Sequence, residues 1–439
     1  MKLTRLLPFA AAAAACLLLC ACGESDPPEV SASEKPAVTE APAATEAPVV
    51  TEAPTAAPTD EYYSDPTDTP EPTDTPAPTE SGEEVHFFSP RFELIFREQT
   101  GRPSGPIYEA DVRSTKKLEF KDERVYELRD LTMFENLEEL SLEGTGVEDI
   151  SILTQMKSLK KLTLVGNRFL KDYSPISSLT GLRELRCTPS DKTPIKDLSM
   201  FSGMSDLESL TVSWVENGDL APIAGLTGLR TLIVGCYSEN RIKDISVVAN
   251  FPDLELLNIS GDFTDLTPLA GLTRMRELVL ACKADDISPI AGMTGLTRLY
   301  IDDRNVKDIS ALSGMKKLVQ LHLNVDVKDI SALAGTTELN WLEIPNSRIE
   351  DISALADSRK LNILRLFNNN ISDISVLSKL SALTDLSLWG NNISDATPLY
   401  PLTALKYLGI GENKLSDEQK QALKEHFEDY PILIEGLDD

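Results

Sequence analysis

One motif is repeated head to tail through most of this 439-residue chain. Residues 361–382 read LNILRLFNNNISDISVLSKLSA, and residues 383–404 read LTDLSLWGNNISDATPLYPLTA. Leucine or isoleucine recurs at the first, fourth, sixth and eleventh places, and an Asp stands at the thirteenth. This spacing matches neither the 3.6-residue period of a helix nor the two-residue period of a long strand. It therefore predicts an array of structural repeats.

The repeat can be followed backwards through thirteen units of 21 to 25 residues. They begin at Leu137, Leu159, Leu182, Leu207, Leu229, Leu254, Met275, Leu296, Leu318, Leu339, Leu361, Leu383 and Leu405. A degenerate unit containing Leu118 and Phe120 precedes them. We expect each unit to form one short strand, a turn and a returning segment. Because no unit can bury its apolar edge alone, neighbouring units must stack around one shared core.

The order of residue types within a unit predicts which side chains face inward. In the pattern L-x-x-L-x-L the fourth and sixth places point to the core and the fifth points outward, as in any strand. The Asp that follows can accept hydrogen bonds from the next backbone N–H groups and start a short helical turn. A metal site is the alternative, but it needs several oxygens converging on one point. We therefore predict twelve caps and no metal: Asp149, Asp172, Asp197, Asp219, Asp244, Asp265, Asp286, Asp308, Asp329, Asp351, Asp373 and Asp395.

The pattern resembles the leucine-rich repeat family over roughly residues 87–430. The form with D-I-S-x-L is similar to the internalin-type repeats of bacterial surface proteins. The resemblance implies an α/β-type repeat solenoid, with a concave parallel β-sheet, convex 3₁₀ turns and helical caps at both ends. The ninth place is Asn in only a few units, namely Asn167, Asn369, Asn391 and Asn413. Two units are longer than the rest, so we expect bulges near 188–195 and 235–242.

Residues 1–22 are predicted to be a lipoprotein signal peptide. Lys2 and Arg5 precede an apolar run over residues 6–19, which is too short to span a membrane as a mature helix. The run ends in L-C-A-C, which resembles a lipoprotein cleavage site. That resemblance implies that Cys22 becomes the first mature residue and carries a diacylglycerol, whose two acyl chains give stable anchoring. The expected location is the extracellular face of the bacterial cell membrane; the alternative is plain secretion with Cys22 free.

Residues 23–84 have the composition of a disordered linker. They hold twelve Pro, sixteen acidic residues and one Lys, with many Thr and Ala and almost no large apolar side chains. Such a segment cannot bury enough apolar surface to offset the entropy lost on ordering. Proline favours the extended polyproline II conformation, and like charges extend the chain further. We expect a stalk that holds the repeats away from the membrane.

A cap is expected at each end of the repeat domain, which covers residues 118–415, because an open solenoid end exposes core residues. The N-terminal cap is residues 85–117. Pro90 after Ser89 is a favourable helix start, and Gly101 ends the helix. One apolar face of this helix carries Phe92, Ile95 and Phe96.

The C-terminal cap is expected over residues 416–439. Ser416 and Gln419 have the spacing of a capping box, in which each side chain bonds the other residue's backbone N–H. Leu423 and Phe427 would then lie on one face of the helix. Neither cap carries residues that suggest catalysis.

The charge and cysteine content narrow the possible partners. A net charge of −28 argues against nucleic acid or an anionic membrane surface, since both need a basic face. Cys187, Cys236 and Cys282 lie in separate units, which is not the pattern of a disulfide framework, so we predict buried free thiols. No cofactor is expected. We expect a monomer that is attached to the membrane only through lipid on Cys22.

Sequence motifs for catalysis are missing. The three histidines are His86, His322 and His426, of which the first and last flank the caps and are expected at the surface. No nucleophile elbow, zinc-binding H-E-x-x-H, P-loop or dinucleotide-binding fingerprint occurs. Only His322 with Glu343 suggests a proton-transfer pair. We therefore predict that the protein is not an enzyme.

The predicted concave face changes character from the eighth unit onward. Outward-facing places hold mainly Glu, Ser, Thr and Lys in the first units, and aromatic rings with scattered charges later. Exposed aromatic residues in one band are typical of a binding surface. The predicted ligand-binding residues are Tyr300, His322, Trp341, Glu343, Arg365, Phe367, Trp389 and Tyr407. The predicted function is recognition of a protein ligand; a structural cell-envelope protein or a glycan-binding module are the alternatives.

Overall fold

The computed structural model describes residues 82–122, 124–189, 193–236 and 241–437. The predicted signal peptide and nearly all of the linker lie outside these residues. Cleavage before Cys22 and the extended stalk therefore stay predictions. In the part of the chain that the model describes, no helix combines the length and apolar character needed to cross a bilayer.

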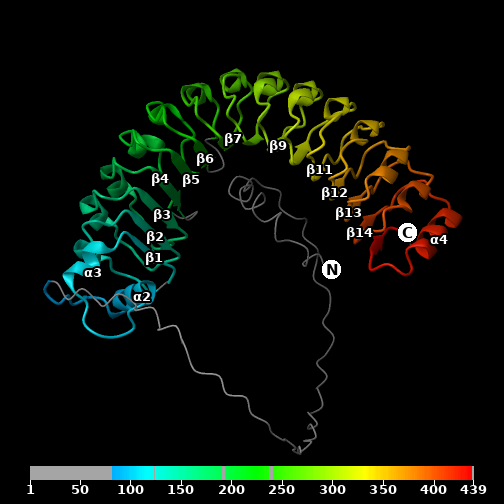
Figure 1. Cartoon of the computed structure of the whole chain (residues 1–439). Coiled ribbons are helices and arrows are strands. Elements are labelled where there is room, and N and C mark those ends of the chain that lie inside the picture. Colours follow the sequence, from blue (N-terminus) through cyan, green and yellow to red (C-terminus); the bar gives the residue numbers. More distant parts are fainter. Residues whose placement is uncertain (1–81, 123, 190–192, 237–240, 438–439) are drawn as a thin grey trace, which may run out of the picture. The chain divides into compact units, whose positions relative to one another are not determined.

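The described residues form one parallel sheet of fifteen strands, which follow each other in chain order (Figure 1). Parallel pairing of consecutive strands requires the chain to return across the convex side after every strand. The strands are β1 (Lys117–Phe120), β2 (Glu139–Glu143), β3 (Lys161–Val165), β4 (Glu184–Thr188), β5 (Ser209–Val215), β6 (Thr231–Cys236), β7 (Leu256–Ser260), β8 (Glu277–Ala281), β9 (Arg298–Asp302), β10 (Gln320–Asn324), β11 (Trp341–Glu343), β12 (Ile363–Arg365), β13 (Asp385–Ser387), β14 (Tyr407–Gly409) and β15 (Leu433–Glu435).

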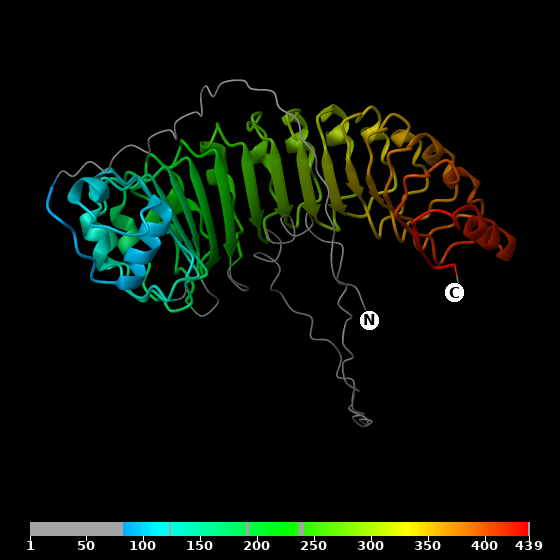
Figure 2. The same ribbon diagram turned by 60° about the horizontal axis from the view of Figure 1, so that its bottom comes forward.

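Short 3₁₀ helices form the returning segments. They lie on the outer side of the curved repeat domain, with the strands on its inner side (Figures 1 and 2). This arrangement confirms the predicted solenoid with a concave sheet and convex turns. The 3₁₀ helices are η1 (Arg129–Met133), η2 (Ser151–Gln155), η3 (Ser174–Ser178), η4 (Leu198–Phe201), η5 (Ala221–Ile223), η6 (Ser246–Asn250), η7 (Thr267–Leu269), η8 (Ser288–Gly292), η9 (Ser310–Gly314), η10 (Ser331–Leu333), η11 (Ser353–Leu355), η12 (Ser375–Lys379) and η13 (Thr397–Leu399).

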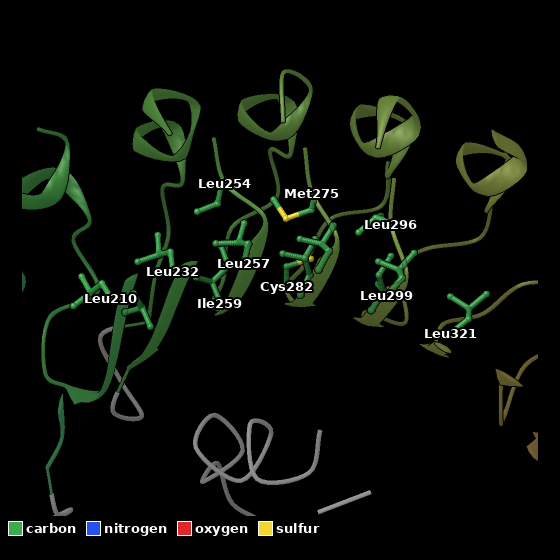
Figure 3. Close-up of a cluster of buried hydrophobic side chains, with 14 of the residues drawn as sticks. Leu210, Leu232, Leu254, Leu257, Ile259, Met275, Cys282, Leu296, Leu299 and Leu321 are labelled. Atoms are coloured by element: carbon green, nitrogen blue, oxygen red, sulfur yellow. The ribbon is translucent and has the colours of Figure 1, made fainter. Parts of the chain in front are cut away.

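The core is a stack of equivalent side chains from successive coils. Leu140 of β2 is in register with Leu162 of β3, which is in register with Leu185 of β4, and all three are buried. Burial alternates as predicted in β2, β3 and β10, with the fourth and sixth places buried and the fifth partly exposed. In β7 the fifth-place residue, Asn258, is buried as well. Figure 3 shows the equivalent stack in later coils, where Leu210, Leu232 and Leu257 lie side by side.

The twelve repeated aspartates are caps, as predicted. In every case the Asp carboxylate accepts the backbone N–H two residues further on, with N–O distances of 2.7 to 2.9 Å. At Asp373 this bond comes from Ser375, and it lowers the pKa of the carboxyl. Each cap thus directs the chain out of the strand layer into the next 3₁₀ helix.

The ninth-place asparagines join neighbouring coils. The side-chain amide of Asn391 donates to the backbone carbonyl of Leu366 one coil earlier and to Leu388 in its own coil, and its oxygen accepts the N–H of Ile371. Asn369 and Asn413 make the equivalent bonds. A single buried side chain therefore satisfies backbone groups on two coils at once.

The irregular part of the sheet lies around β5. Residues 190–192 and 237–240, within the two expected bulges, lie outside the described residues. The register between β5 and β6 shifts between Val212 and Val215, and Trp214 in this stretch has a φ of 56°. The two longer units therefore place an irregularity in the strand between them.

The N-terminal cap contains the predicted helix and, in addition, a second short helix. Helix α2 (Pro90–Thr100) starts after Ser89, whose hydroxyl accepts the N–H of Phe92, and ends at Gly101 with a φ of 68°. Its predicted apolar residues are buried: Phe92, Ile95 and Phe96. A second helix, α3 (Glu109–Ser114), was not predicted.

The side chain of Gln99 in α2 seals the first edge of the sheet. It accepts the N–H of Glu119 in β1 at 3.0 Å and donates to the carbonyl of the same residue. One amide thereby occupies the backbone groups that another strand would use.

The C-terminal cap differs from its prediction in one contact and one strand. Helix α4 (Asp417–His426) starts at Ser416, whose hydroxyl accepts the N–H of Gln419 at 3.3 Å. The Gln419 side chain, however, bonds the N–H of Ala396 in the preceding coil, so the capping box is only half formed. Strand β15 follows the helix and was not expected. It extends the sheet by one strand beyond the last recognisable repeat.

The cysteines and histidines differ in how far they are buried. Cys187 and Cys282 are buried free thiols, as predicted, whereas Cys236 is only partly buried. His86 is exposed. His426 was expected at the surface, but it is partly buried and stacks on Tyr400 with ring centroids 4.3 Å apart.

We predict that replacing one cap destabilises the repeat domain measurably. Asp373→Ala should lower the free energy of unfolding at pH 7 by about 1 kcal/mol, since one charge-assisted cap is lost. Because the folded-state pKa of Asp373 is lowered from 3.8, the stabilisation exists above that pH and disappears as pH falls through the folded value. Urea denaturation at pH 7 and pH 3 should therefore show a smaller difference from the wild type at pH 3.

The neighbouring exposed residue supplies the control for this cap. Ser372→Ala should leave the free energy of unfolding unchanged at both pH values. Equal effects of Ser372→Ala and Asp373→Ala would contradict the capping role.

Candidate functional site

Parallel register sorts the concave side chains of β9 to β14 into three rows. The third-place row contains Arg298, Gln320, Trp341, Ile363, Asp385 and Tyr407. The fifth-place row contains Tyr300, His322, Glu343, Arg365, Ser387 and Gly409. The seventh-place row includes Phe367 and Trp389, whose backbones bond consecutive coils. We call these three rows from β9 to β14 the concave site.

All eight predicted site residues point away from the core. Each is partly exposed, whereas the leucines between them are almost fully buried. The rings nevertheless do not form one continuous line, because successive coils place them in different rows. Rows two residues apart along a strand are separated by about 6.6 Å. The predicted strip is therefore a staggered band of rings with polar groups between them.

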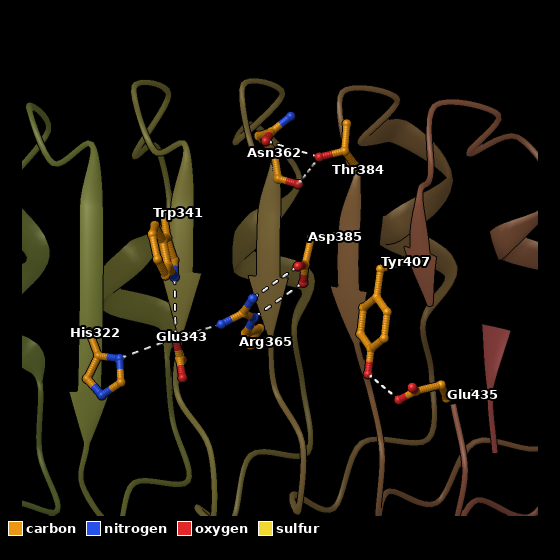
Figure 4. Close-up of polar contacts among 9 residues, drawn as sticks. All are labelled: His322, Trp341, Glu343, Asn362, Arg365, Thr384, Asp385, Tyr407 and Glu435. Carbon is orange, nitrogen blue, oxygen red and sulfur yellow. Dashed lines mark hydrogen bonds and ion pairs between the residues drawn. The ribbon is translucent and has the colours of Figure 1, made fainter. Parts of the chain in front are cut away.

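Glu343 is the centre of a polar network that joins four strands (Figure 4). Its carboxylate lies 3.4 Å from Nδ1 of His322, accepts the indole N–H of Trp341 at 3.3 Å, and lies 3.8 Å from Arg365. Arg365 in turn donates to both oxygens of Asp385, at 3.3 and 3.0 Å. His322, Glu343, Arg365 and Asp385 are thereby held by partners on neighbouring strands, and Trp341 is held by Glu343 of its own strand.

The charges in this network stabilise each other despite partial burial. Burial alone would raise the pKa of Glu343, but the His322 hydrogen bond and the Arg365 charge outweigh it and lower the pKa. Burial would likewise lower the pKa of Arg365, and the bonds to Asp385 raise it instead. The indole N–H of Trp341 and the nearby His322 and Arg365 thus favour the ionised form of the Glu343 carboxylate. These contacts hold the carboxylate in one position on the concave face.

Stacking fixes the rings next to this network. The rings of Tyr300 and His322 lie parallel, with centroids 4.4 Å apart and an interplanar angle of 10°. The guanidinium of Arg365 lies 5.7 Å from the ring of Trp341, within the range of a cation–π contact. Both pairs join adjacent or nearby strands, so the rings are held in place before any ligand arrives.

Trp389 has a different environment from the other rings. A Cβ atom added to Gly411 in the next coil would lie 2.5 Å from the Trp389 indole, and one added to Gly436 would lie 2.8 Å from it. The indole therefore covers two glycines, which have no side chains of their own, beside the last strands of the sheet. Trp389 is partly exposed as predicted, but it also packs the last coil.

Tyr407 makes the last contact of the concave site. Its hydroxyl donates to Glu435 of β15 at 2.9 Å. Burial is the main cause, and the Glu435 carboxylate the second, that raises the pKa of Tyr407 to about 12. Glu435, Gly411 and Gly436 had not been connected with the site. Glu435 and Gly436 belong to or follow β15, which carries no recognisable repeat, so no sequence signal placed them there. Gly411 is the seventh place of the last repeat, and the repeat spacing does put it beside Trp389.

Metal binding finds no geometric support in the described ranges. No group of three or more His, Cys, Asp or Glu side chains there converges in a way that could hold an ion. The acidic residues of the concave site are instead paired with Arg365, His322 and Trp341.

The coil stack is similar to several solved structures. An internalin from Listeria monocytogenes matches with a TM-score of 0.59 and 26% sequence identity, over 78% of this chain and 93% of that one. A leucine-rich repeat protein from Leptospira interrogans matches with a TM-score of 0.59 and 16% identity, over 74% of this chain and 97% of that one. A plant peptide hormone receptor, RGFR1 in complex with RGF2, matches with a TM-score of 0.50 and 17% identity, over 68% of this chain and 58% of that one.

No model of a known protein family matches the sequence, and no curated protein matches it. The fold, the repeat spacing and the stacked caps nevertheless define the class: the chain is a leucine-rich repeat protein. Within that class its repeats are internalin-like, with one parallel strand and one 3₁₀ turn in each coil.

We predict that Gly411→Ala disrupts the packing under Trp389. The added methyl group would meet the indole closer than van der Waals contact allows, so the free energy of unfolding should fall by about 1–3 kcal/mol. Urea denaturation measures the change. Gly225→Ala is the matched control, because a Cβ there meets nothing within 4 Å. An unchanged stability of Gly411→Ala would mean that the indole is not held over this glycine.

Proposed function

We propose that this protein is a cell-surface lipoprotein that binds a protein ligand through the concave site. The observation that carries the proposal is the set of half-exposed rings held by the network around Glu343. Large aromatic residues and arginine are enriched at the energetic centres of protein interfaces. Such a surface suits adhesion or recognition. The sequence carries no catalytic motif that would suggest another use for it.

The first half of the concave face offers much less to a ligand. Its outward charges are largely paired with each other across strands, as in the contact of Lys161 with Glu184 at 2.8 Å and that of Lys121 with Glu143 at 3.3 Å. Exposed ion pairs of this kind contribute little net energy when a partner displaces their water. The aromatic band of β9 to β14 is therefore the part of the face that we expect to contact the ligand.

Preorganisation favours binding by this band. The side chains of Arg365 and Glu343 are already held by partners on other strands, so a ligand does not have to immobilise them. Each flexible side chain ordered on association costs about 0.5–1.5 kcal/mol, and here much of that cost is met in folding. A concave sheet of this length also suits an extended partner segment that lies across several strands.

The similarity to a peptide hormone receptor of the same fold supports a protein or peptide partner. The rings could stack on sugars instead, which is why a glycan remains the alternative ligand. A structural envelope role is the second alternative, in which the band would bind nothing. Both alternatives give distinct outcomes in the experiment below.

The lipid anchor is proposed from the sequence alone. The L-C-A-C stretch ending at Cys22 would place two acyl chains at the start of the mature chain, and the acidic linker would carry the repeat domain outward. The concave site would then face partners outside the cell membrane.

We predict that Trp341→Ala combined with Phe367→Ala weakens ligand capture at least tenfold. Both rings are partly exposed and stand on the concave face, outside the leucine core, so their removal should affect binding more than folding. The measurement is capture of cell-wall material and secreted proteins by the purified full chain. Thr163→Ala with Thr211→Ala, on β3 and β5, is the matched control on the charged half of the same face.

The nature of the captured material distinguishes the alternatives. Protease treatment that abolishes capture indicates a protein ligand, whereas periodate treatment that abolishes it indicates a glycan. Equal capture by the ring variant, the threonine variant and the wild type would favour the structural envelope role.

We predict that Cys22→Ser releases the protein from the membrane. Without the thiol no thioether-linked diacylglycerol can form, and the acyl chains that hold the chain are lost. Fractionation of producing cells, together with incorporation of a labelled fatty acid, measures the change. Membrane retention of the variant with an unchanged label would contradict the anchor.

A further inference from the structure

A pocket of about 350 Å³ lies at the side of the coil stack, where the returning segments lead into β8, β9 and β10. It is lined by Glu255, Thr273, Arg274, Arg276, Gly295 and Lys317. Three cations therefore surround one carboxylate, although the whole chain has a net charge of −28. Such a local reversal of charge marks a place where an anion is favoured.

The pocket interrupts a regular alternation of charge along this side. The residue just before the first position of each coil runs Asp253, Arg274, Gly295, Lys317, Glu338 and Lys360 through six successive coils. Arg274 pairs with Asp253 at 2.5 Å, and Lys360 pairs with Glu338 at 2.7 Å. Gly295 stands where an acidic residue would complete the alternation between Arg274 and Lys317.

The neighbouring positions do not supply the missing acid. Arg276 lies 3.5 Å from Glu255, but the same carboxylate is shared with Arg230 at 3.3 Å. Thr297 occupies the same repeat position in the coil of β9 as Arg276 does in the coil of β8, and it is uncharged. Within the described part of the chain, Lys317 forms no ion pair. At Gly295 and Thr297 the chain leading into β9 therefore offers no charge between the cations of the coils on either side.

The spacing of the two flanking coils suits a tetrahedral oxyanion held between them. Coils two apart in the stack are separated by about 9.6 Å at the strands, since adjacent strands lie about 4.8 Å apart. An oxyanion with charged donors about 2.8 Å from its oxygens spans a similar distance. Arginine and lysine from the two flanking coils can therefore both reach an anion that rests on Gly295.

We propose that this pocket, between Arg274 and Arg276 on one side and Lys317 on the other, binds a phosphate group. A phosphate carries up to two negative charges near neutral pH, which matches the excess of cations over carboxylate in the pocket. The pocket lies outside the concave site, so the two surfaces can be occupied independently. The phosphate is either the free ion or one unit of a phosphate-containing polymer.

Calorimetric titration of the purified full chain with inorganic phosphate at low ionic strength tests the proposal. The wild type should bind with a dissociation constant of about 1 mM or tighter, and Lys317→Gln should weaken binding about tenfold, because one charge-assisted bond is lost. Lys316→Gln is the matched control: the neighbouring ammonium donates to the carbonyl of Ala334, outside the pocket. Absence of binding by the wild type, or equal losses in the two lysine variants, would overturn the proposal.

A second variant tests the vacant acidic position directly. A Cβ at Gly295 meets only the carbonyl oxygens of Met275 at 3.4 Å and Thr273 at 3.9 Å, so Gly295→Asp should fold. Its carboxylate should occupy the place of the phosphate, abolish binding and leave the melting temperature at or above the wild-type value. Phosphate binding retained by Gly295→Asp would contradict the assigned position.

Titration with poly(glycerol phosphate) distinguishes the two sources of phosphate. Higher affinity per phosphate for the polymer, lost in Lys317→Gln, means that the pocket recognises a polymer unit. Equal affinity per phosphate for polymer and free ion means that the free ion suffices. Affinity for the polymer that is unchanged in Lys317→Gln would overturn the proposed site.

Discussion

The register of each strand on the next is the interaction on which this molecule depends. Leucines of successive coils stack at equal heights, and the backbone bonds between coils repeat through all fifteen strands. A parallel sheet in this order exists only if every coil returns across the convex side, which the aspartate caps enforce at the same point each time. Stability is then a sum of local terms, with each coil supported by its two neighbours. Outward-facing positions are free to vary without disturbing that sum.

The concave site uses this freedom. Register brings His322, Glu343, Arg365 and Asp385 onto four neighbouring strands, although 63 positions separate the first from the last in the sequence. The network costs the fold little, because the residues that form it alternate with buried leucines that carry the packing. The same arrangement explains the phosphate pocket, where a glycine in one coil leaves a gap in a row of paired charges. Both surfaces are built by changing a few positions in a constant frame.

The repeat made most of this structure predictable. The spacing of leucine and aspartate was enough to assign the solenoid, the inward and outward places, the twelve caps and the outward direction of Trp341 and Phe367. The repeat pattern could not predict contacts made by residues outside the repeats or by side chains that choose between two partners. Strand β15 has no leucine pattern of its own, so Glu435 and Gly436 were missed. Gln419 had the spacing of a capping box, yet a free N–H on Ala396 in the adjacent coil competed successfully for its side chain.

The contact of Gln99 with β1 has a consequence for how such a chain can grow. A side-chain amide imitates the peptide group of a missing strand, and the helix that carries it closes the beginning of the sheet. No further coil can be stacked at that end without first removing α2. Lengthening of the molecule by duplication of its units is therefore blocked at this end of the sheet. A unit inserted between existing coils, by contrast, meets the same surfaces above and below.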